Sequence, residues 1–381
     1  MADFDLERYR ALFPHLQTNL RYFNHAAVSP FSTPVREAVQ SYLQMKNVTN
    51  PEPFELLLKT MIETKEKLGR LVGTSKDRIA LMDNTSNGLN IIATGIDWKA
   101  GDRIILPDIE FPANVYPFMN LKRHGVEIDF VLHRGGKILV EDIERLITRR
   151  TRLVSISHVQ FLHGFRADLQ AISALCHKNS ILLSVDAIQS AGTTPIDVRA
   201  MGIDFLAAGG QKWLMGPEGI AFIYVSEECQ NRLSLGSMGW MNNKDFFSDF
   251  FRYRIDLEDS ARRFENGTPN AMGVFGLNAS VGLLLEVGIE KIERQLVHLT
   301  QVIIDRVRKE GVELVSPEQH SERGGIVTFR PPNAQAMFQR LRKANVMVSI
   351  REECIRFSPH FYNTEAELSE ALDVAFAPLP S

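Results

Sequence analysis

Seven short apolar segments, spread over residues 78–225 and separated by helix-like patterns, constrain the fold more than any other feature of the sequence. Most are continuously apolar rather than alternating, which is typical of strands buried on both faces of a sheet. The last two are joined by a short link, GGQKWLMGPEG, and could be antiparallel. The pattern predicts a large, mostly parallel α/β sheet flanked by helices. The segments are RIALM (78–82), RIILP (103–107), EIDFVL (127–132), RLVSISHV (152–159), ILLSV (181–185), DFLAA (204–208) and IAFIYV (220–225).

Helical patterns precede and follow these segments. One helix is expected to begin at Ser32, Thr33 and Pro34, and a second to span residues 54–72. From about Asp259 the pattern changes to long helices, short strands and a final helix. We therefore expect two domains. A large α/β domain spans 18–258 and a small C-terminal α+β domain spans 259–381, with residues 1–17 forming an N-terminal helix that packs on the small domain.

The composition argues against several classes of partner. The chain has 381 residues, 44% of them hydrophobic, and a formal net charge of -3, so nothing points to nucleic acid or to an anionic membrane. No apolar stretch is long enough for a membrane span. The N-terminus has no basic region followed by an apolar run, and three widely spaced cysteines do not suggest a disulfide framework. We expect a cytoplasmic protein.

Four polar features fall just beyond predicted strands, where ligands bind in open α/β sheets. In the first, DNTSNGLN, Thr85 and Ser86 precede a helix that starts near Asn87. Hydroxyl groups at a helix N-terminus either bind a phosphate or simply cap the helix.

The second feature is Asp186, which ends an apolar run. A buried carboxylate needs a cationic partner, and, taken alone, Asp186 is better explained by a helix cap or an ion pair with an arginine.

The third feature is Lys212, in GGQKW. Because Trp213 follows the lysine, this is not a Walker A loop. The small residues at 207–210 leave room for a large group, and a desolvated lysine amine readily forms Schiff bases. A surface-loop lysine is the alternative. The fourth feature is Arg356, with Arg351 nearby, in REECIRFS. Arginine is the usual receptor for a carboxylate, and an interdomain ion pair is the alternative.

Taken together, these features resemble the class V aminotransferase family of fold-type I pyridoxal-phosphate enzymes, which includes cysteine desulfurases, selenocysteine lyases, kynureninase and isopenicillin N epimerase. The resemblance runs from YFNHAAVSP (22–30) to YNTEAEL (362–368). Its most specific motifs are the pair SVDAIQSAG and GGQKWLMGPEGIAFIYV, together with RFENGTPN (263–270). It implies a large cofactor domain with a mostly parallel mixed sheet, a smaller C-terminal α+β domain, and pyridoxal 5′-phosphate as the cofactor.

The resemblance also implies roles around the cofactor ring. Lys212 would hold the cofactor covalently and later move protons at the substrate Cα. Asp186 would pair with the pyridinium nitrogen and keep the ring a strong electron sink. Gln189 would hydrogen-bond the phenolate oxygen. Phe111 would stack on the ring, at a position where many members have histidine. His158 would either lie near the cofactor or be structural.

Other roles concern the phosphate and a second subunit. Thr85, Ser86 and the Asn87 amide would hold the phosphate, and Gln211 would face it. Thr268 resembles a residue that reaches the phosphate of the partner subunit, which implies a homodimer. Residues 234–254 are rich in Phe, Met and Trp. That composition suits an apolar substrate contact or a dimer interface equally, so the sequence does not specify the substrate side chain.

The reaction type is less constrained than the cofactor. Arg356, with Arg351 as second choice, would bind the substrate α-carboxylate. Cysteine desulfurases use a cysteine on a mobile loop, whereas Cys354 lies in or beside a predicted strand, which favours a buried apolar role. We therefore expect an enzyme acting at Cα of an amino acid or related amine, with an aminotransferase as first choice. A lyase or epimerase is the alternative. The combination of Lys212, Asp186 and Gln189 argues against a binding module that has lost catalysis.

Overall fold

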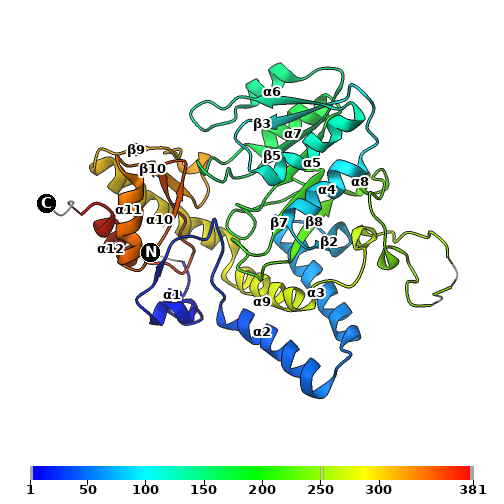
Figure 1. Ribbon diagram of the computed structural model, residues 1–381, viewed down its shortest axis with the longest axis horizontal. Helices are drawn as coiled ribbons and strands as arrows, with labels where there is room; N and C mark the ends of the chain where they lie inside the picture. The colour runs from blue at the N-terminus through cyan, green and yellow to red at the C-terminus, as the bar shows by residue number, and fades with distance from the viewer. Residues whose placement is uncertain (1–2, 249, 252, 378–381) are drawn as a thin grey trace.

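The computed structural model describes residues 3–248, 250–251 and 253–377, and its central feature is a seven-stranded sheet (Figure 1). The strand order is β2-β8-β7-β6-β5-β3-β4. Strands β3 to β7 pair in parallel, whereas β8 is antiparallel to both of its neighbours, as the short link before it suggested. The strands are β2 (Ile79–Met82), β3 (Arg103–Pro107), β4 (Glu127–Val131), β5 (Thr151–Ser157), β6 (Leu182–Asp186), β7 (Phe205–Gly209) and β8 (Ala221–Val225).

Helices cover both faces of this sheet. On one face, α4 (Thr85–Gly95) and α5 (Tyr116–Met119) bury Leu89, Ile92 and Phe118 against the strands. The apolar cluster on the other face is larger. The helices that contribute to it include α3 (Phe54–Val72), α6 (Val140–Leu146), α7 (Leu169–Lys178) and α9 (Ala271–Val287). This layered arrangement confirms the predicted fold class.

The parallel strands bring polar residues together at one edge of the sheet. Asp186 ends β6 directly beside Ser157, which ends β5. Gly209 ends the next strand, β7, and the turn that carries Lys212 follows it. Since β5, β6 and β7 are parallel neighbours, their carboxyl ends meet at the same place.

A second, four-stranded antiparallel sheet lies in the C-terminal part of the chain, with strand order β12-β13-β10-β9. The apolar segment VMVSI (346–350) divides between two sheets: β11 (Val346–Met347) pairs with β1 (Arg21–Tyr22), and β12 joins the four-stranded sheet. The remaining elements here are β9 (Glu313–Leu314), β10 (Val327–Arg330), β12 (Ser349–Arg351), β13 (Cys354–Phe357), α10 (Ile289–Lys309), α11 (Ala334–Lys343) and α12 (Glu365–Ala375).

The division into domains at residue 258 stays a prediction. Helix α9 falls in the predicted small domain and packs against α3 and against α2 (Thr33–Gln44), which both belong to the predicted large domain. Within the described residues no single helix is long and apolar enough to span a bilayer. Helices α9 and α10 would reach that length only together, and the chain bends by 78° between them.

The N-terminal segment forms less helix than expected. Helix α1 covers Leu6–Arg10, and a 3-10 turn follows at Pro14–Gln17, because proline lacks the N–H that a continuing helix needs. The segment packs on the C-terminal part of the chain: Arg10 pairs with Glu367, and the ring of Phe13 stacks on Tyr362 at 3.8 Å. Residues 1–2 of the predicted helix and 378–381 of the predicted small domain lie outside the described residues.

Candidate active site

Lys212 lies on the turn after β7, mostly removed from water. Its backbone is fixed, since the Ser29 hydroxyl donates a 2.6 Å hydrogen bond to the Lys212 carbonyl. Burial is the main reason that the pKa of the amine is lowered to about 8; the charge of Asp186 opposes this shift, and the charges of Arg356 and Arg351 add to it. An amine with a pKa near neutrality is partly unprotonated under physiological conditions, so Lys212 is available as a nucleophile.

Asp186 is the carboxylate nearest to this chemistry. The side chain is only 1% exposed, and burial raises its pKa to about 6. A 2.9 Å hydrogen bond from the Ile188 amide and the charge of Lys212 act in the opposite direction. Asp186 is therefore a buried carboxylate held beside an amine rather than in a close ion pair, which suits it to a second cationic partner such as a pyridinium.

The start of α4 and the end of β7 together form a site for an anion. The Thr85 hydroxyl is buried and makes no hydrogen bond within the described residues. A Cβ placed on Gly209 would lie 3.1 Å from that hydroxyl and 2.5 Å from the Gln211 side-chain oxygen, so only glycine leaves this space open. The first amides of α4, at Thr85 and Ser86, have no partner inside the helix. A phosphate fits here.

The prediction for the Asn87 amide needs a correction. That N–H donates to the Asn84 side-chain oxygen at 2.9 Å, which is the helix-capping alternative. The Asn87 side chain is exposed and donates to Asp83 at 3.2 Å. The structure therefore brings Thr85, Ser86 and Gln211 together, whereas the Asn87 amide is already engaged.

Two phenylalanines line the site above Lys212. The Phe111 ring centre lies 5.5 Å from the Lys212 amine, and Phe111 is 43% exposed, which leaves a flat apolar surface for a ring. Phe161 meets Phe111 edge-on at 5.3 Å between ring centres. The sequence predicted Phe111 and missed Phe161, which directly follows the Gln160 position in a loop with no pattern of its own.

Among the described residues, Arg356 is a buried cation whose hydrogen-bond partners are all uncharged. It is 2% exposed, donates to the Phe161 carbonyl at 2.6 Å and to the Ser349 hydroxyl at 3.4 Å, and leaves its Nε without a partner in the described chain. Burial lowers its pKa to about 10, with Arg351 adding to the effect. A guanidinium in this state is suited to a carboxylate. Arg351 is exposed on the neighbouring strand and donates to the carbonyl of Ile350.

Gln189 is buried in the turn after β6. Its side-chain oxygen accepts from the Trp213 indole at 2.7 Å, and its nitrogen donates to the Ala26 carbonyl at 3.1 Å. One amide hydrogen remains for a ligand.

The sequence did not identify Glu110, whose carboxylate accepts from the amide of Ser157 at 2.7 Å and from its hydroxyl. Burial raises the pKa of Glu110 to about 7, and the only signal in the sequence was an acidic residue immediately before Phe111.

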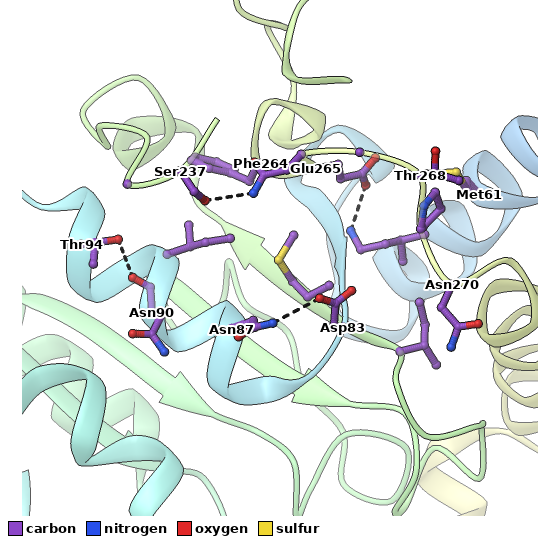
Figure 2. A pocket seen from close by; sticks show the side chains of 18 residues that line it. Met61, Asp83, Asn87, Asn90, Thr94, Ser237, Phe264, Glu265, Thr268 and Asn270 are labelled. Carbon is purple, nitrogen blue, oxygen red and sulfur yellow. Dashed lines mark hydrogen bonds between the residues drawn. The ribbon is translucent and has the colours of Figure 1, made fainter. Parts of the chain in front are cut away.

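Two predicted residues line other cavities. His158 lines a separate cavity of about 1230 Å³ between the start of α7 and α10. Burial lowers the pKa of His158 to about 3, so its ring is neutral. Thr268 lines another pocket, of about 490 Å³, together with Asp83, Asn87 and Asn270, on the outer side of α4 (Figure 2). The contacts of His158 and Thr268 with a cofactor remain predictions.

The remaining residues fit pyridoxal phosphate. The cofactor needs an amine for its aldehyde, a cup for its phosphate and a carboxylate for its ring nitrogen, and Lys212, the Thr85 hydroxyl beside Gly209, and Asp186 are of the right chemical type. When bound, this cofactor supplies an electron sink that weakens the bonds at the substrate Cα.

Comparison with known proteins agrees with this geometry. The family model for Aminotransferase class-V matches residues 21–371. The uncharacterized aminotransferase YcbU of Bacillus subtilis is 30% identical over 367 residues, which cover 96% of each chain. The apo cysteine desulfurase of Thermococcus onnurineus superimposes with a TM-score of 0.88 at 26% identity, over 98% of each chain. A variant of C-DES with glycine covalently linked to its PLP cofactor shares the fold, with a TM-score of 0.89 at 22% identity over 96% of this chain and 99% of that one. The chain therefore belongs to the class V aminotransferase family and is a pyridoxal-phosphate-dependent enzyme.

Proposed function

We propose that the protein is an aminotransferase for an α-amino acid or a related amine that carries a carboxylate. The observation that supports this most directly is the pairing of a buried amine of lowered pKa, Lys212, with a buried guanidinium whose protein partners are neutral, Arg356. One can move a proton at Cα and the other can bind the carboxylate attached to that carbon. Transamination requires no further acid or base.

Each remaining residue has a proposed part in this site. With the cofactor bound, Asp186 would pair with the ring nitrogen and Gln189 would hydrogen-bond the phenolate oxygen. Phe111 covers the ring, and its apolar surface provides stacking but no proton transfer. Thr85, Ser86 and Gln211 hold the phosphate. Arg351, exposed at the rim, is a second cation for the substrate.

Cys354 supports transamination over sulfur transfer. It lies in β13, on the two-strand hairpin that also carries Arg356, and is 1% exposed. Its thiol lies 3.3 Å from the Glu352 carbonyl, and burial raises its pKa. A thiol that accepts sulfur must be a reachable thiolate. A short hairpin with a protonated, buried thiol is poorly suited to that task.

We further propose that the active form is a homodimer. Thr268 lines a pocket with Asp83 and Asn270 that Lys212 does not line, which is the placement expected of a residue that serves the partner's phosphate (Figure 2). Nearby, large apolar side chains at Trp240, Phe247 and Tyr253 are exposed in the single chain. Apolar surface of this kind is typical of a protein interface.

A single-turnover experiment tests the proposed reaction. The holoenzyme is mixed with a panel of amino acids, and the absorbance of the cofactor and the products are followed together. We expect conversion to the pyridoxamine form with one equivalent of 2-oxo acid for each site. Release of sulfide, selenide or alanine would identify a lyase, and racemisation of the amino acid an epimerase. The variant Cys354→Ala is the matched control and should react at close to the original rate.

A further inference from the structure

Trp213 directly follows the lysine that carries the cofactor, and it is completely buried. Its indole N–H donates to the Gln189 side-chain oxygen at 2.7 Å, and the Gln189 nitrogen donates to the Ala26 carbonyl at 3.1 Å. The side-chain amide of Gln189 is therefore held at both ends by the protein.

The two partners specify which end of this amide is the oxygen. An indole N–H can only donate and a main-chain carbonyl can only accept. Turning the amide over would place two donors against each other at Trp213 and two acceptors against each other at Ala26. The orientation of the Gln189 amide is therefore assigned from the hydrogen-bonding chemistry of its two partners. It does not depend on telling the amide oxygen from the nitrogen by position alone. This orientation leaves one N–H of Gln189 available to donate to a ligand.

Trp213 cannot easily turn away from this contact. Its carbonyl accepts a hydrogen bond from the His360 ring at 3.1 Å, and the rings of His25 and His360 lie 6.2 and 5.7 Å from the indole. On the other side, a Cβ on Gly325 would lie 2.7 Å from the tip of the indole ring, so only glycine admits the tryptophan here. The indole is fixed by three separate segments of the chain.

We propose that Trp213 is a positioning residue that makes Gln189 present a hydrogen-bond donor, and never its carbonyl oxygen, to the phenolate oxygen of the cofactor. The inference rests on the proposed role of Gln189 and holds whichever bond at Cα is broken. A donor stabilises the ionised phenolate, whereas an acceptor would repel it. Trp213 therefore helps to set the pH at which the visible band of the bound cofactor changes. A stabilised phenolate lowers the pKa of the proton that lies between it and the Lys212 nitrogen.

The first test is the pH titration of the visible band in the variant Trp213→Phe, which keeps an aromatic ring and removes the N–H. We expect the transition to move upward by about half to one pH unit, since part of a charge-assisted hydrogen bond is lost. Gln189→Leu should move it upward by about one unit. The matched control is Trp98→Phe: the Trp98 indole donates to the Ala93 carbonyl at 2.6 Å on α4, so its loss should leave the transition where it is.

The double variant separates positioning from packing. If Trp213 acts through Gln189, adding Trp213→Phe to Gln189→Leu should produce no further shift. An additive shift, or a shift in Gln189→Leu with none in Trp213→Phe, would overturn the inference and leave the role of Gln189 intact. No shift in Gln189→Leu would instead remove the proposed role of Gln189.

A second measurement keeps the inference testable if Trp213→Phe does not fold. The wild-type protein has three tryptophans, so the variants Trp98→Phe and Trp240→Phe together assign the remaining indole N–H resonance to Trp213. Adding pyridoxal phosphate to the apoprotein should shift the Trp213 indole resonance in wild type and shift it much less in Gln189→Leu. Equal shifts in the two proteins would contradict coupling through Gln189.

Discussion

Lys65 and Lys212 are both removed from most contact with water, yet their surroundings differ. Lys65 lies on the buried side of α3, is 7% exposed, and places its amine 3.3 Å from the carboxylate of Glu265. That carboxylate also accepts from the Leu81 amide at 2.9 Å, so the pair ties α3, β2 and the loop after residue 264 together. Lys212 has Asp186 as an attractive neighbour, but two arginines oppose it.

The difference shows how the same residue type serves two purposes. A buried charge is tolerated when a close opposite charge and additional hydrogen bonds compensate for the lost water. Without a close partner, and with like charges nearby, the amine gives up its proton more easily. Lys65 is therefore a structural cation, and Lys212 is a reactive amine. Opposite effects on stability and on chemistry should follow when each lysine is removed.

The largest effect is expected for Lys212→Ala. Loss of the only amine proposed to bind the cofactor covalently should lower the rate by about 10⁴-fold or more and abolish the visible band. The apoprotein should be no less stable than wild type in urea, because no close ion pair is broken. Lys67→Ala is the control, since the Lys67 amine donates to the Asn278 carbonyl away from the site. A visible band that survives in Lys212→Ala would show that another group holds the cofactor.

Lys65→Met should do the reverse. It leaves Glu265 buried without its cation, and we expect the free energy of unfolding to fall by about 3–5 kcal/mol. Urea unfolding of the apoprotein measures this change. The double variant Lys65→Met/Glu265→Gln should recover much of the loss, since glutamine still accepts from the Leu81 amide without a charge. Any Lys65→Met protein that folds should still form the visible band; its loss would place Lys65 in the chemistry.

Arg356 provides a third case, a buried cation with neutral partners. Arg356→Gln should lower kcat/KM by about 10²–10³-fold, mainly through KM, because the substrate carboxylate loses a charged donor. Arg356→Lys should be intermediate, since an ammonium group cannot bind a carboxylate through two parallel hydrogen bonds. Arg323 is the matched control: it is 3% exposed with neutral partners, including Thr300 and Gln301, but lies elsewhere. Arg323→Gln should reduce stability and leave KM unchanged, and a similar rise in KM in both variants would contradict carboxylate binding by Arg356.

The sequence predicted the sheet well because most of its strands are continuous apolar runs, which need no knowledge of distant contacts. The prediction from sequence failed where consecutive residues pair with different strands. The segment VMVSI divides at Val348 because β11 and β12 pair with different strands, and no local pattern shows that. Likewise, Pro14 shortens the N-terminal helix although the apolar pattern continues past it.

The site divides in a similar way. Lys212 and Asp186 were predictable because strand ends of a parallel sheet converge, and the resemblance assigned their roles. The contact of Arg356 with Phe161 joins residues 195 positions apart, and the indole of Trp213 reaches Gln189 across 24 positions. Lys65 falls in the helix predicted over residues 54–72, but the sequence does not identify Glu265 as its partner. What separates a structural lysine from a reactive one is the distance to a carboxylate, which only the folded chain defines.

The smallest effect, and the most direct test of the comparison, is expected for Arg351→Gln. The Lys212 amine has a pKa of about 8 in the folded chain, below its value in the unfolded chain. It therefore becomes neutral above about pH 8 in the folded protein, while the unfolded chain still binds the proton. The free energy of unfolding of the apoprotein should rise between that pH and the pKa of an ordinary lysine. Covalent capture of added pyridoxal phosphate should rise over the same midpoint. Removing the Arg351 charge raises the pKa of Lys212, so both transitions should move upward by about half a pH unit.

Arg330→Gln removes an exposed arginine from β10, where Arg330 pairs with Glu313, and serves as the control. If the midpoint stays fixed in Arg351→Gln, the Arg351 charge does not set the reactivity of Lys212, and its part in the contrast with Lys65 is removed.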